Sequence, residues 1–381
     1  MDGGRWRRDA RERSMRIGYK ASYLFEPRKS GIHVYLVNLL RAMADLGEVD
    51  IRLYASGVGR ELEPEARELL GRASGARLSR VQRGWDRAMM PLYALVDGID
   101  VMHVPSPFVP TWFPKPLVAT VHDLAPFRMP DMYESEREAY AKLTREVIQA
   151  PDVLVAVSES TKRDVVEFFD MPEDRIVVSP LGVNDRFRPV EAAEERVSER
   201  FDLDQSYVMA VVGSAHPRKN LAGVVRIFDR LDRDDLDLVI VGSCERDAEA
   251  TQAIAESPQR ERIRVLGHLP EEDLPLVYSG ARLLCFPTYY EGWGLPVLEA
   301  LACGTPVVCA DNSSLPEAGG DAAVLLQADD LDAFVHAVGR LIDDQAHWEE
   351  RRARGLAHAA DFTWRRTARC TLDAYRRARD M

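Results

Sequence analysis

Residues 289–299 read Tyr289-Tyr-Glu-Gly-Trp-Gly-Leu-Pro-Val-Leu-Glu299, and this segment carries the clearest structural signal in the chain. It follows the apolar run Arg282–Phe286, which predicts a buried strand, and it opens a helix in which Pro296 suits the first turn. Gly292 and Gly294 allow the backbone to come close to a ligand, and the N-terminus of the helix presents free N–H groups to an anion. Strand, glycine turn and helix together predict an α/β unit that binds an anionic ligand at the carboxyl end of a strand.

Two carboxylates, Glu291 and Glu299, bracket this loop eight residues apart. Glu291 lies on the loop and Glu299 in the early turns of the predicted helix, so they can contact different parts of one extended ligand. A carboxylate accepts hydrogen bonds from two neighbouring hydroxyls. We therefore expect a sugar at Glu291, a diphosphate over the loop and a ribose at Glu299. On the residues alone, the alternative interpretation is purely structural: a glycine turn before a helix that is acidic at its N-terminus.

Short apolar runs alternate with helix-period segments along most of the chain, in two series. Runs such as Val153–Val157 are apolar without alternation, which is typical of strands covered by helices on both faces and hence of parallel sheets. The pattern predicts a doubly wound α/β fold of two Rossmann-like domains that face a central cleft. The expected strands are Arg16–Lys20, Ile51–Ala55, Val101–Val104, Leu117–Val121, Val153–Val157 and Ile176–Ser179, then Tyr207–Val212, Asp237–Val241, Ile263–Gly267, Arg282–Phe286, Pro306–Ala310 and Ala322–Leu326.

A polar, charge-rich link over Glu191–Arg200 separates the two series and predicts the domain boundary. Ser30 is a good N-cap for a helix that follows it, and mixed charge over Glu134–Ala150 predicts another helix. The expected division is a disordered basic tail (1–14), an acceptor domain (15–190), a nucleotide-sugar donor domain (191–360) and a C-terminal helix that crosses back to the first domain (361–381).

The composition excludes several classes of protein. The chain has 381 residues with 62 acidic and 50 basic side chains, a net charge of −12, which disfavours nucleic acid as a partner. Apolar residues make up 46%, an ordinary globular proportion, and no apolar run has the length of a membrane span. The five cysteines form no C-x-x-C pair, which predicts free thiols in a reducing compartment.

Three further segments follow expected strands and face the same cleft. In Gly213-Ser-Ala-His-Pro-Arg-Lys-Asn220, the adjacent cations Arg218 and Lys219 can neutralise a diphosphate leaving group without a metal. His122 follows a strand of the first domain and stands on the opposite wall. Gly31, directly after the helix cap Ser30, lets backbone N–H groups approach a phosphate. On the residues alone, two alternatives stay open: His122 is a structural histidine, and Arg218 and Lys219 belong to a solvated basic turn.

Together these residues resemble the retaining nucleotide-sugar glycosyltransferases of family 4, which have the GT-B fold. The likeness runs from about Met15 to Arg376. The residues that carry it are Glu291-Gly-Trp-Gly-Leu-Pro-Val-Leu-Glu299, Ala302-Cys-Gly-Thr-Pro-Val-Val308, Ser314-Leu-Pro-Glu317, Pro217-Arg-Lys-Asn220, His122-Asp-Leu124, Val157-Ser-Glu159 and Pro180-Leu-Gly-Val183.

The resemblance implies a role for each candidate residue. Arg218 and Lys219 hold the donor diphosphate, Glu299 binds the ribose, and Glu291 binds the donor sugar. His122 lies beside the transferred sugar. The implied donor-binding backbone positions are Gly31, Gly213, Gly292, Trp293, Gly294 and Leu295. Gly267 and His268 are implied to lie beside the nucleobase of the donor.

The implied activity is transfer of a hexose from a nucleotide sugar to a saccharide or lipid-linked saccharide in polysaccharide or glycoconjugate assembly. Likeness to polysaccharide-assembly relatives favours mannose from GDP-mannose. Three alternatives stay open: a UDP-hexose donor, a sugar-nucleotide epimerase of the same fold, and a non-catalytic nucleotide-sugar binding subunit. A nicotinamide oxidoreductase is disfavoured, because no G-x-G-x-x-G follows the first strand of either domain.

We expect no cofactor and no essential metal, because the scattered Asp-x-Asp pairs match chance in so acidic a chain. The expected location is the cytoplasm, with peripheral contact at the inner face of the membrane. Two segments suit the acceptor or the membrane: Phe108–Pro114, which is aromatic and proline-rich, and Trp85–Val96, which is apolar and lies near Arg80, Arg83 and Arg87. Ordinary loop packing is the alternative for both.

Overall fold

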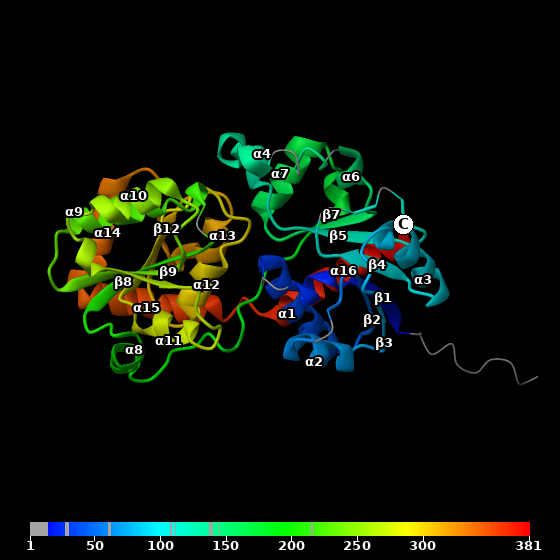
Figure 1. Ribbon diagram of the computed structural model, residues 1–381, viewed down its shortest axis with the longest axis horizontal. Coiled ribbons are helices and arrows are strands. Elements are labelled where there is room, and N and C mark those ends of the chain that lie inside the picture. Colours follow the sequence, from blue (N-terminus) through cyan, green and yellow to red (C-terminus); the bar gives the residue numbers. More distant parts are fainter. Residues whose placement is uncertain are drawn as a thin grey trace, which may run out of the picture.

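A computed structural model describes residues 14–26, 30–59, 62–106, 109–110, 112–136, 140–143, 145–214 and 216–381. Most of the expected basic tail, residues 1–13, lies outside this part of the chain, as do Phe108 and Thr111 of the aromatic loop. Figure 1 shows the two sheets in separate lobes.

The first sheet has seven strands in the order β3-β2-β1-β4-β5-β6-β7, and every neighbouring pair is parallel. All six strands expected in this half are confirmed within two residues at each end. The edge strand β3 was missed, because its four residues alternate between half-buried and exposed and carry no apolar run. The strands are β1 (Met15–Lys20), β2 (Val49–Ala55), β3 (Gly75–Leu78), β4 (Val101–Val104), β5 (Leu117–Val121), β6 (Val153–Ala156) and β7 (Ile176–Val178).

The second sheet has six parallel strands in the order β10-β9-β8-β11-β12-β13. All six were expected. They are β8 (Ser206–Ser214), β9 (Leu236–Ser243), β10 (Ile263–Gly267), β11 (Leu283–Phe286), β12 (Val307–Ala310) and β13 (Val324–Leu326). In both sheets the central strands are fully buried, as their unbroken apolar runs predict.

Helices connect the strands of both sheets. Ser30 caps the first of them: its hydroxyl accepts a hydrogen bond from the His33 N–H at 3.3 Å. In the first half the helices are α1 (Gly31–Leu46), α2 (Pro64–Arg72), η2 (Trp85–Met89), α3 (Met90–Val96), α4 (Ala125–Arg128), η3 (Pro130–Glu136), α6 (Arg145–Gln149) and α7 (Glu159–Phe169). In the second half they are α8 (Ala193–Phe201), η5 (Pro217–Lys219), α9 (Leu221–Leu231), α10 (Ala248–Glu256), α11 (Leu274–Gly280), α12 (Leu295–Ala302), α13 (Leu315–Gly319), α14 (Leu331–Asp343) and α15 (Gln345–Ala359).

The expected continuous helix over Glu134–Ala150 is wrong. In the structure η3 ends at Glu136, and among the described residues that follow it Lys142 lies in a turn before the five-residue helix α6. Tyr140 and Leu143, between the two helices, line the cavity described below. Packing over the cleft therefore overrides the helical charge pattern of this segment.

The last helix, α16 (Trp364–Asp380), returns to the first half and packs against α1 and the first sheet (Figure 1). The Ser179 hydroxyl donates to the Thr367 carbonyl at 3.1 Å, which fixes the helix beside β7. Among the described residues, no helix combines the length and the apolar composition needed to cross a membrane.

Candidate active site

A cavity of about 540 Å³ lies between the two halves, at the carboxyl ends of their strands. It brings together ten of the thirteen residues that the sequence predicts for the site. From the first half come Gly31 and His122, and from the second half Gly213, Arg218, Lys219, Glu291, Gly292, Trp293, Gly294 and Leu295.

Glu291 lies at the centre of a buried ion cluster. Its Oε1 atom is 2.5 Å from Lys219 Nζ and 3.1 Å from Arg218 Nη1. Burial on its own raises the pKa of Glu291, but the adjacent Lys219 and Arg218 outweigh it and hold the pKa below its ordinary value. The carboxylate is therefore ionised, and the cluster keeps a surplus of positive charge that suits a diphosphate.

The chain around Glu291 is held by hydrogen bonds from neighbouring elements. Its backbone N–H donates to Ser313 Oγ at 2.9 Å, and its carbonyl accepts from Ser314 Oγ at 2.9 Å. The Thr288 hydroxyl donates to Glu291 Oε1 at 3.2 Å. The carboxylate is thus fixed before any ligand arrives, which is the condition for electrostatic stabilisation of a developing charge.

His122 stands on the opposite wall, directly after β5. Its Nε2 atom is 3.2 Å from the Pro105 carbonyl, so the proton is assigned to Nε2 and Nδ1 keeps its lone pair. The Tyr35 ring meets the imidazole edge-on at 4.8 Å between ring centroids. Burial lowers the pKa of His122 to about 4, so this side chain is a neutral acceptor near pH 7.

The glycines at the site differ in how strictly the structure requires glycine at each position. A Cβ atom at Gly292 would lie 1.9 Å from the His122 carbonyl oxygen, so only glycine allows the two halves to meet there. Gly294 has φ +98°, a conformation that favours glycine. At Gly31 a Cβ would meet nothing within 4 Å, so the surroundings leave free space beside the start of α1.

Trp293 contributes less to the cavity than its place in the loop suggests. The residue is only 4% exposed, and its ring packs against Phe362 at 5.7 Å between centroids. Its indole thus belongs mainly to the core beneath the loop.

Glu299, Gly267 and His268 do not line this cavity. Glu299 accepts a hydrogen bond from the Tyr278 hydroxyl at 2.9 Å, and burial raises its pKa to about 7. Gly267 ends β10 with φ +68°, and His268 after it is exposed. The residues assigned to sugar and diphosphate therefore form one group, and those assigned to ribose and base lie outside it.

Several residues that hold the halves together were not predicted from the sequence. The Tyr290 hydroxyl donates to Asp164 Oδ2 at 2.5 Å across the cleft. The Glu317 carboxylate accepts the Glu159 and Ser160 N–H groups, at 2.8 and 2.9 Å, at the N-terminus of α7. Both residues lie in motif segments, but a single sequence does not say which residue of the other half they meet.

A stacked ring pair also bridges the halves beside the ion cluster. The Tyr133 ring, from η3, lies over the His216 imidazole with centroids 4.3 Å apart and planes 25° apart. Tyr133 gave no signal in the sequence, because nothing in its own segment indicates a ring partner in the other half.

Comparison with known proteins identifies the family. The family model "Glycosyl transferases group 1" matches residues 193–357, and "Glycosyltransferase Family 4" matches residues 29–187. The chain is 32% identical to an O-antigen chain mannosyltransferase B from Escherichia coli, over 74% of this chain and 76% of that protein. It is 33% identical to a D-inositol 3-phosphate glycosyltransferase from Salinispora tropica, over 68% of this chain and 58% of that protein.

Among solved structures, a sucrose-phosphate synthase from Thermosynechococcus elongatus aligns with a TM-score of 0.75 at 19% identity. The alignment covers 95% of this chain and 98% of that one. This likeness shows the fold. The two matched models, the relatives and the two facing parallel sheets agree, and the chain belongs to glycosyltransferase family 4 and has the GT-B fold.

Proposed function

We propose that this glycosyltransferase is a retaining enzyme that moves a hexose from a nucleotide sugar to a saccharide or lipid-linked saccharide in polysaccharide assembly. One observation carries the proposal: the ionised Glu291 and its two cations face the neutral His122 across a single cavity. Such a cluster provides a polar contact for a sugar beside a positive site for the diphosphate that leaves it.

In the proposed reaction the bond between the sugar and the diphosphate breaks while the acceptor hydroxyl attacks from the same face. Arg218 and Lys219 stabilise the negative charge that grows on the leaving diphosphate. That diphosphate takes the proton of the acceptor hydroxyl. His122 accepts a hydrogen bond from a sugar hydroxyl through Nδ1 and does not itself become charged, because its pKa is about 4.

The donor is proposed to be GDP-mannose. The similarity to the E. coli O-antigen chain mannosyltransferase B supports mannose and a polysaccharide acceptor. A UDP-hexose remains the second candidate. The chain is about as similar to the D-inositol 3-phosphate glycosyltransferase as to the mannosyltransferase, and the name of the former does not specify mannose. An epimerase of the same fold is the third, and it would interconvert free donor without an acceptor.

A panel of nucleotide sugars, assayed for nucleotide release with and without acceptor, tests these alternatives. We expect release from GDP-mannose that depends on acceptor, with a product that keeps the anomeric configuration of the donor by NMR. Acceptor-free isomerisation of the donor would establish the epimerase instead. Product of inverted configuration would overturn the retaining mechanism.

The site assignment is tested by Glu291→Gln, which removes the carboxylate but keeps its shape. We expect kcat to fall on the order of 100- to 1000-fold, the cost of losing one pre-positioned electrostatic group. The matched control is Glu261→Gln, an exposed carboxylate beside β10, which should keep the wild-type rate. Full activity in Glu291→Gln would sink the assignment.

Metal independence is proposed because two cations already face the diphosphate site. Transfer measured in excess EDTA should match the rate with added Mg²⁺ or Mn²⁺. A rate that collapses in EDTA and returns with the metal would show that Arg218 and Lys219 are not sufficient.

The proposed location is the cytoplasm. Cys244, Cys285, Cys303, Cys309 and Cys370 are all free thiols in the part of the chain that is described, which suits a reducing compartment.

A further inference from the structure

Exposed apolar side chains are concentrated in one short segment of the first half. Of the ten large hydrophobic residues that are exposed in the described chain, six lie between residues 78 and 96: Leu78, Val81, Met89, Leu92, Leu95 and Val96. Val96 is 69% exposed, Val81 65% and Leu92 52%. Scattered apolar residues are normal on a protein surface, whereas a contiguous group marks an interaction site.

The segment is apolar on both of its sides. Met90 and Ala94 of α3 are fully buried in the first half, as the inner face of a surface helix should be. The outward positions, which are normally polar, are Met89, Leu92 and Val96. Their spacing of three and four residues places them along one side of the η2–α3 segment.

The same segment is basic in an acidic protein. Residues 76–96 contain four arginines and one aspartate, a net charge of +3 in a chain of net charge −12. Arg77 pairs with Asp97 at 2.6 Å. Arg80, Arg83 and Arg87 are exposed, and within the described chain none of them forms an ion pair. Their charge is therefore available to an external anion.

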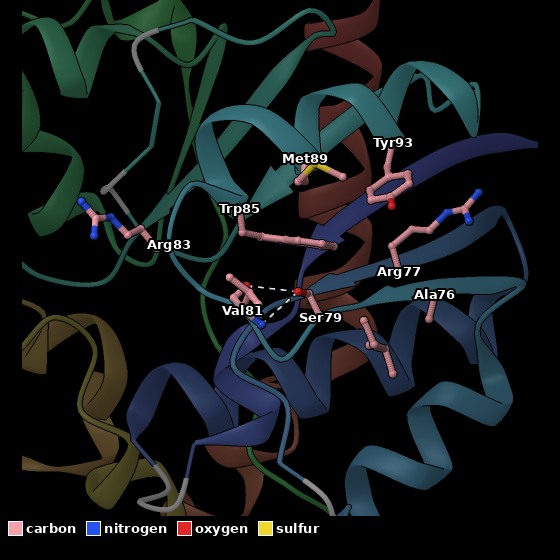
Figure 2. Close-up of a pocket in the computed structure, with 9 residues that line it drawn as sticks. Ala76, Arg77, Ser79, Val81, Arg83, Trp85, Met89 and Tyr93 are labelled. Atoms are coloured by element: carbon pink, nitrogen blue, oxygen red, sulfur yellow. Dashed lines mark hydrogen bonds between the residues drawn. The ribbon is translucent and has the colours of Figure 1, made fainter.

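A cavity of about 400 Å³ opens in this segment, and its lining includes Leu78, Val81, Met89 and Arg83. Figure 2 shows Val81, Trp85, Met89 and Tyr93 around it, with Arg83 and Arg77 at opposite ends of the view. Trp85 is 5% exposed and forms the floor of the segment rather than its outer surface. The surface thus combines apolar side chains, a hollow and cations in one place.

We propose that this surface, defined as Leu78, Val81, Met89, Leu92, Leu95 and Val96 with Arg80, Arg83 and Arg87 and called here the η2–α3 face, docks the protein on an anionic lipid bilayer. Apolar side chains flanked by unpaired arginines match the interface of such a bilayer, where acyl chains lie beneath negative headgroups. A second copy of the chain fits less well. A two-fold contact through this face would bring the same arginines of both copies together.

The place of the face suits an enzyme that works on a membrane-held acceptor. It begins at Leu78, the carboxyl end of β3, and His122 follows the carboxyl end of β5 in the same parallel sheet. Four strand spacings separate the two strands, which is roughly 19 Å. In Figure 1, α3 lies on the side of the first half that points away from the second, so the second half does not cover the face.

Flotation of the full chain with lipid vesicles tests the proposal, and it needs neither donor nor acceptor. A failed transfer assay would therefore leave this test intact. We expect binding to vesicles of phosphatidylcholine with 30% phosphatidylglycerol and weak binding to phosphatidylcholine alone. The triple variant Arg80→Ser/Arg83→Ser/Arg87→Ser should lower the partition coefficient on the order of 100-fold, because each arginine near an anionic surface contributes about fivefold.

A second variant, Leu92→Ser/Leu95→Ser/Val96→Ser, removes apolar area and keeps the charge. It should lower the partition coefficient by roughly tenfold or more, since binding scales with the apolar area buried. The matched control is Arg365→Ser/Arg369→Ser/Arg377→Ser, which removes three exposed arginines of α16, where Met381 is the single exposed large hydrophobic neighbour among the described residues. It should change binding less than threefold.

Three results would overturn the proposal. One is no binding of the wild type to anionic vesicles. Another is an equal loss of binding in the α16 control, which would mean that general charge, not this face, attracts the protein. The last is a dimer in light scattering that the face variants dissociate without any vesicle binding, which would make the face an interface between copies.

Discussion

Glu291 and Glu299 occupy opposite electrostatic environments, although only the glycine turn and the first turn of α12 separate them in the chain. Two cations hold the pKa of Glu291 below its ordinary value, whereas burial raises the pKa of Glu299 to about 7. The positive charge of Arg186 offsets only part of this rise in the pKa of Glu299, and the negative charge of Glu271 adds to it. At neutral pH the first carboxylate is charged and the second is close to its midpoint.

The affinity for a nucleotide sugar should therefore depend on pH through Glu299. The ionised carboxylate accepts hydrogen bonds from both ribose hydroxyls, and the protonated acid accepts fewer. Below pH 7 the free protein must lose a proton to reach that form, so affinity should fall up to about tenfold per pH unit from pH 7 to pH 5. Calorimetry with GDP-mannose suits the measurement, because its diphosphate bridge does not titrate in this range.

The matched variant is Glu299→Gln, which cannot ionise. Its affinity should be lower than that of the wild type at pH 8 and almost flat between pH 5.5 and 8. If wild type and variant share the same pH profile, then Glu299 does not contact the nucleoside, and another acidic group gives the dependence.

At the scale of elements, Gly292 is where the loop before α12 meets the end of β5. A Cβ there would lie 1.9 Å from the His122 carbonyl oxygen, and that oxygen is backbone and cannot turn aside. Gly292→Ala should keep the halves slightly apart and lower kcat by about 100-fold, the typical cost of a displacement near 1 Å. Nucleotide affinity should change little, because Glu299 and the base region lie outside this contact.

Gly71→Ala is the control for the glycine-to-alanine change itself. Gly71 lies in α2, and a Cβ there would meet nothing within 4 Å. It should keep the wild-type rate and melt at the same or a slightly higher temperature. Wild-type kcat in Gly292→Ala would show that this close contact is not part of the reactive state.

The elements also show which signals a single sequence carries. Apolar runs such as Val153–Val157 predicted twelve strands, because a strand that is covered on both faces is apolar along its whole length. The strand ends in turn placed His122, Arg218 and Glu291 on one cleft, because the carboxyl ends of parallel strands share an edge. The edge strand β3 has no such run, because its residues alternate between half-buried and exposed, so that one face of the strand is open to solvent.

Residues that act across the cleft were beyond prediction for a different reason. Tyr290, Asp164 and Glu317 are each ordinary within their own segment, and their partners lie more than 100 positions away. Only the relative placement of the two halves brings them together. The helix wrongly expected over Glu134–Ala150 has the same origin, since its middle residues pack over the cavity instead.

The molecule as a whole is held together by contacts between its halves, and Glu317 makes one of them. Its carboxylate accepts two N–H groups at the N-terminus of α7, where the helix dipole favours a negative charge. Glu317→Ala should weaken the closed state by about 1–2 kcal/mol, the range for such a cap. A larger radius of gyration by small-angle scattering and a several-fold lower kcat should follow.

Glu173→Ala serves as the comparison, because it removes an equal charge from a surface pair with Lys162 inside the first half. It should leave both the radius of gyration and kcat unchanged. If Glu317→Ala behaves in the same way, closure rests on Tyr290 and the loop contacts alone.

The chain end is also part of the first half, through a buried hydrogen-bond network centred on Tyr375 of α16. The Tyr375 hydroxyl is 2.7 Å from His103 Nδ1 and donates to the Tyr19 hydroxyl at 3.0 Å, and His103 Nε2 is 2.8 Å from Thr120 Oγ1. Tyr375→Phe leaves buried polar groups without partners and keeps the packing. We expect it to lower the free energy of unfolding of the first half by about 1–3 kcal/mol, measured by urea denaturation.

Tyr289→Phe provides the control, because Tyr289 lies on the second half and is 37% exposed. It should leave both unfolding transitions in place. In a two-domain chain the transitions of the halves can separate, so the loss in Tyr375→Phe should appear in the transition of the first half. An unchanged first transition would mean that α16 is held there by its apolar face alone and that the buried network adds nothing to the stability of the first half.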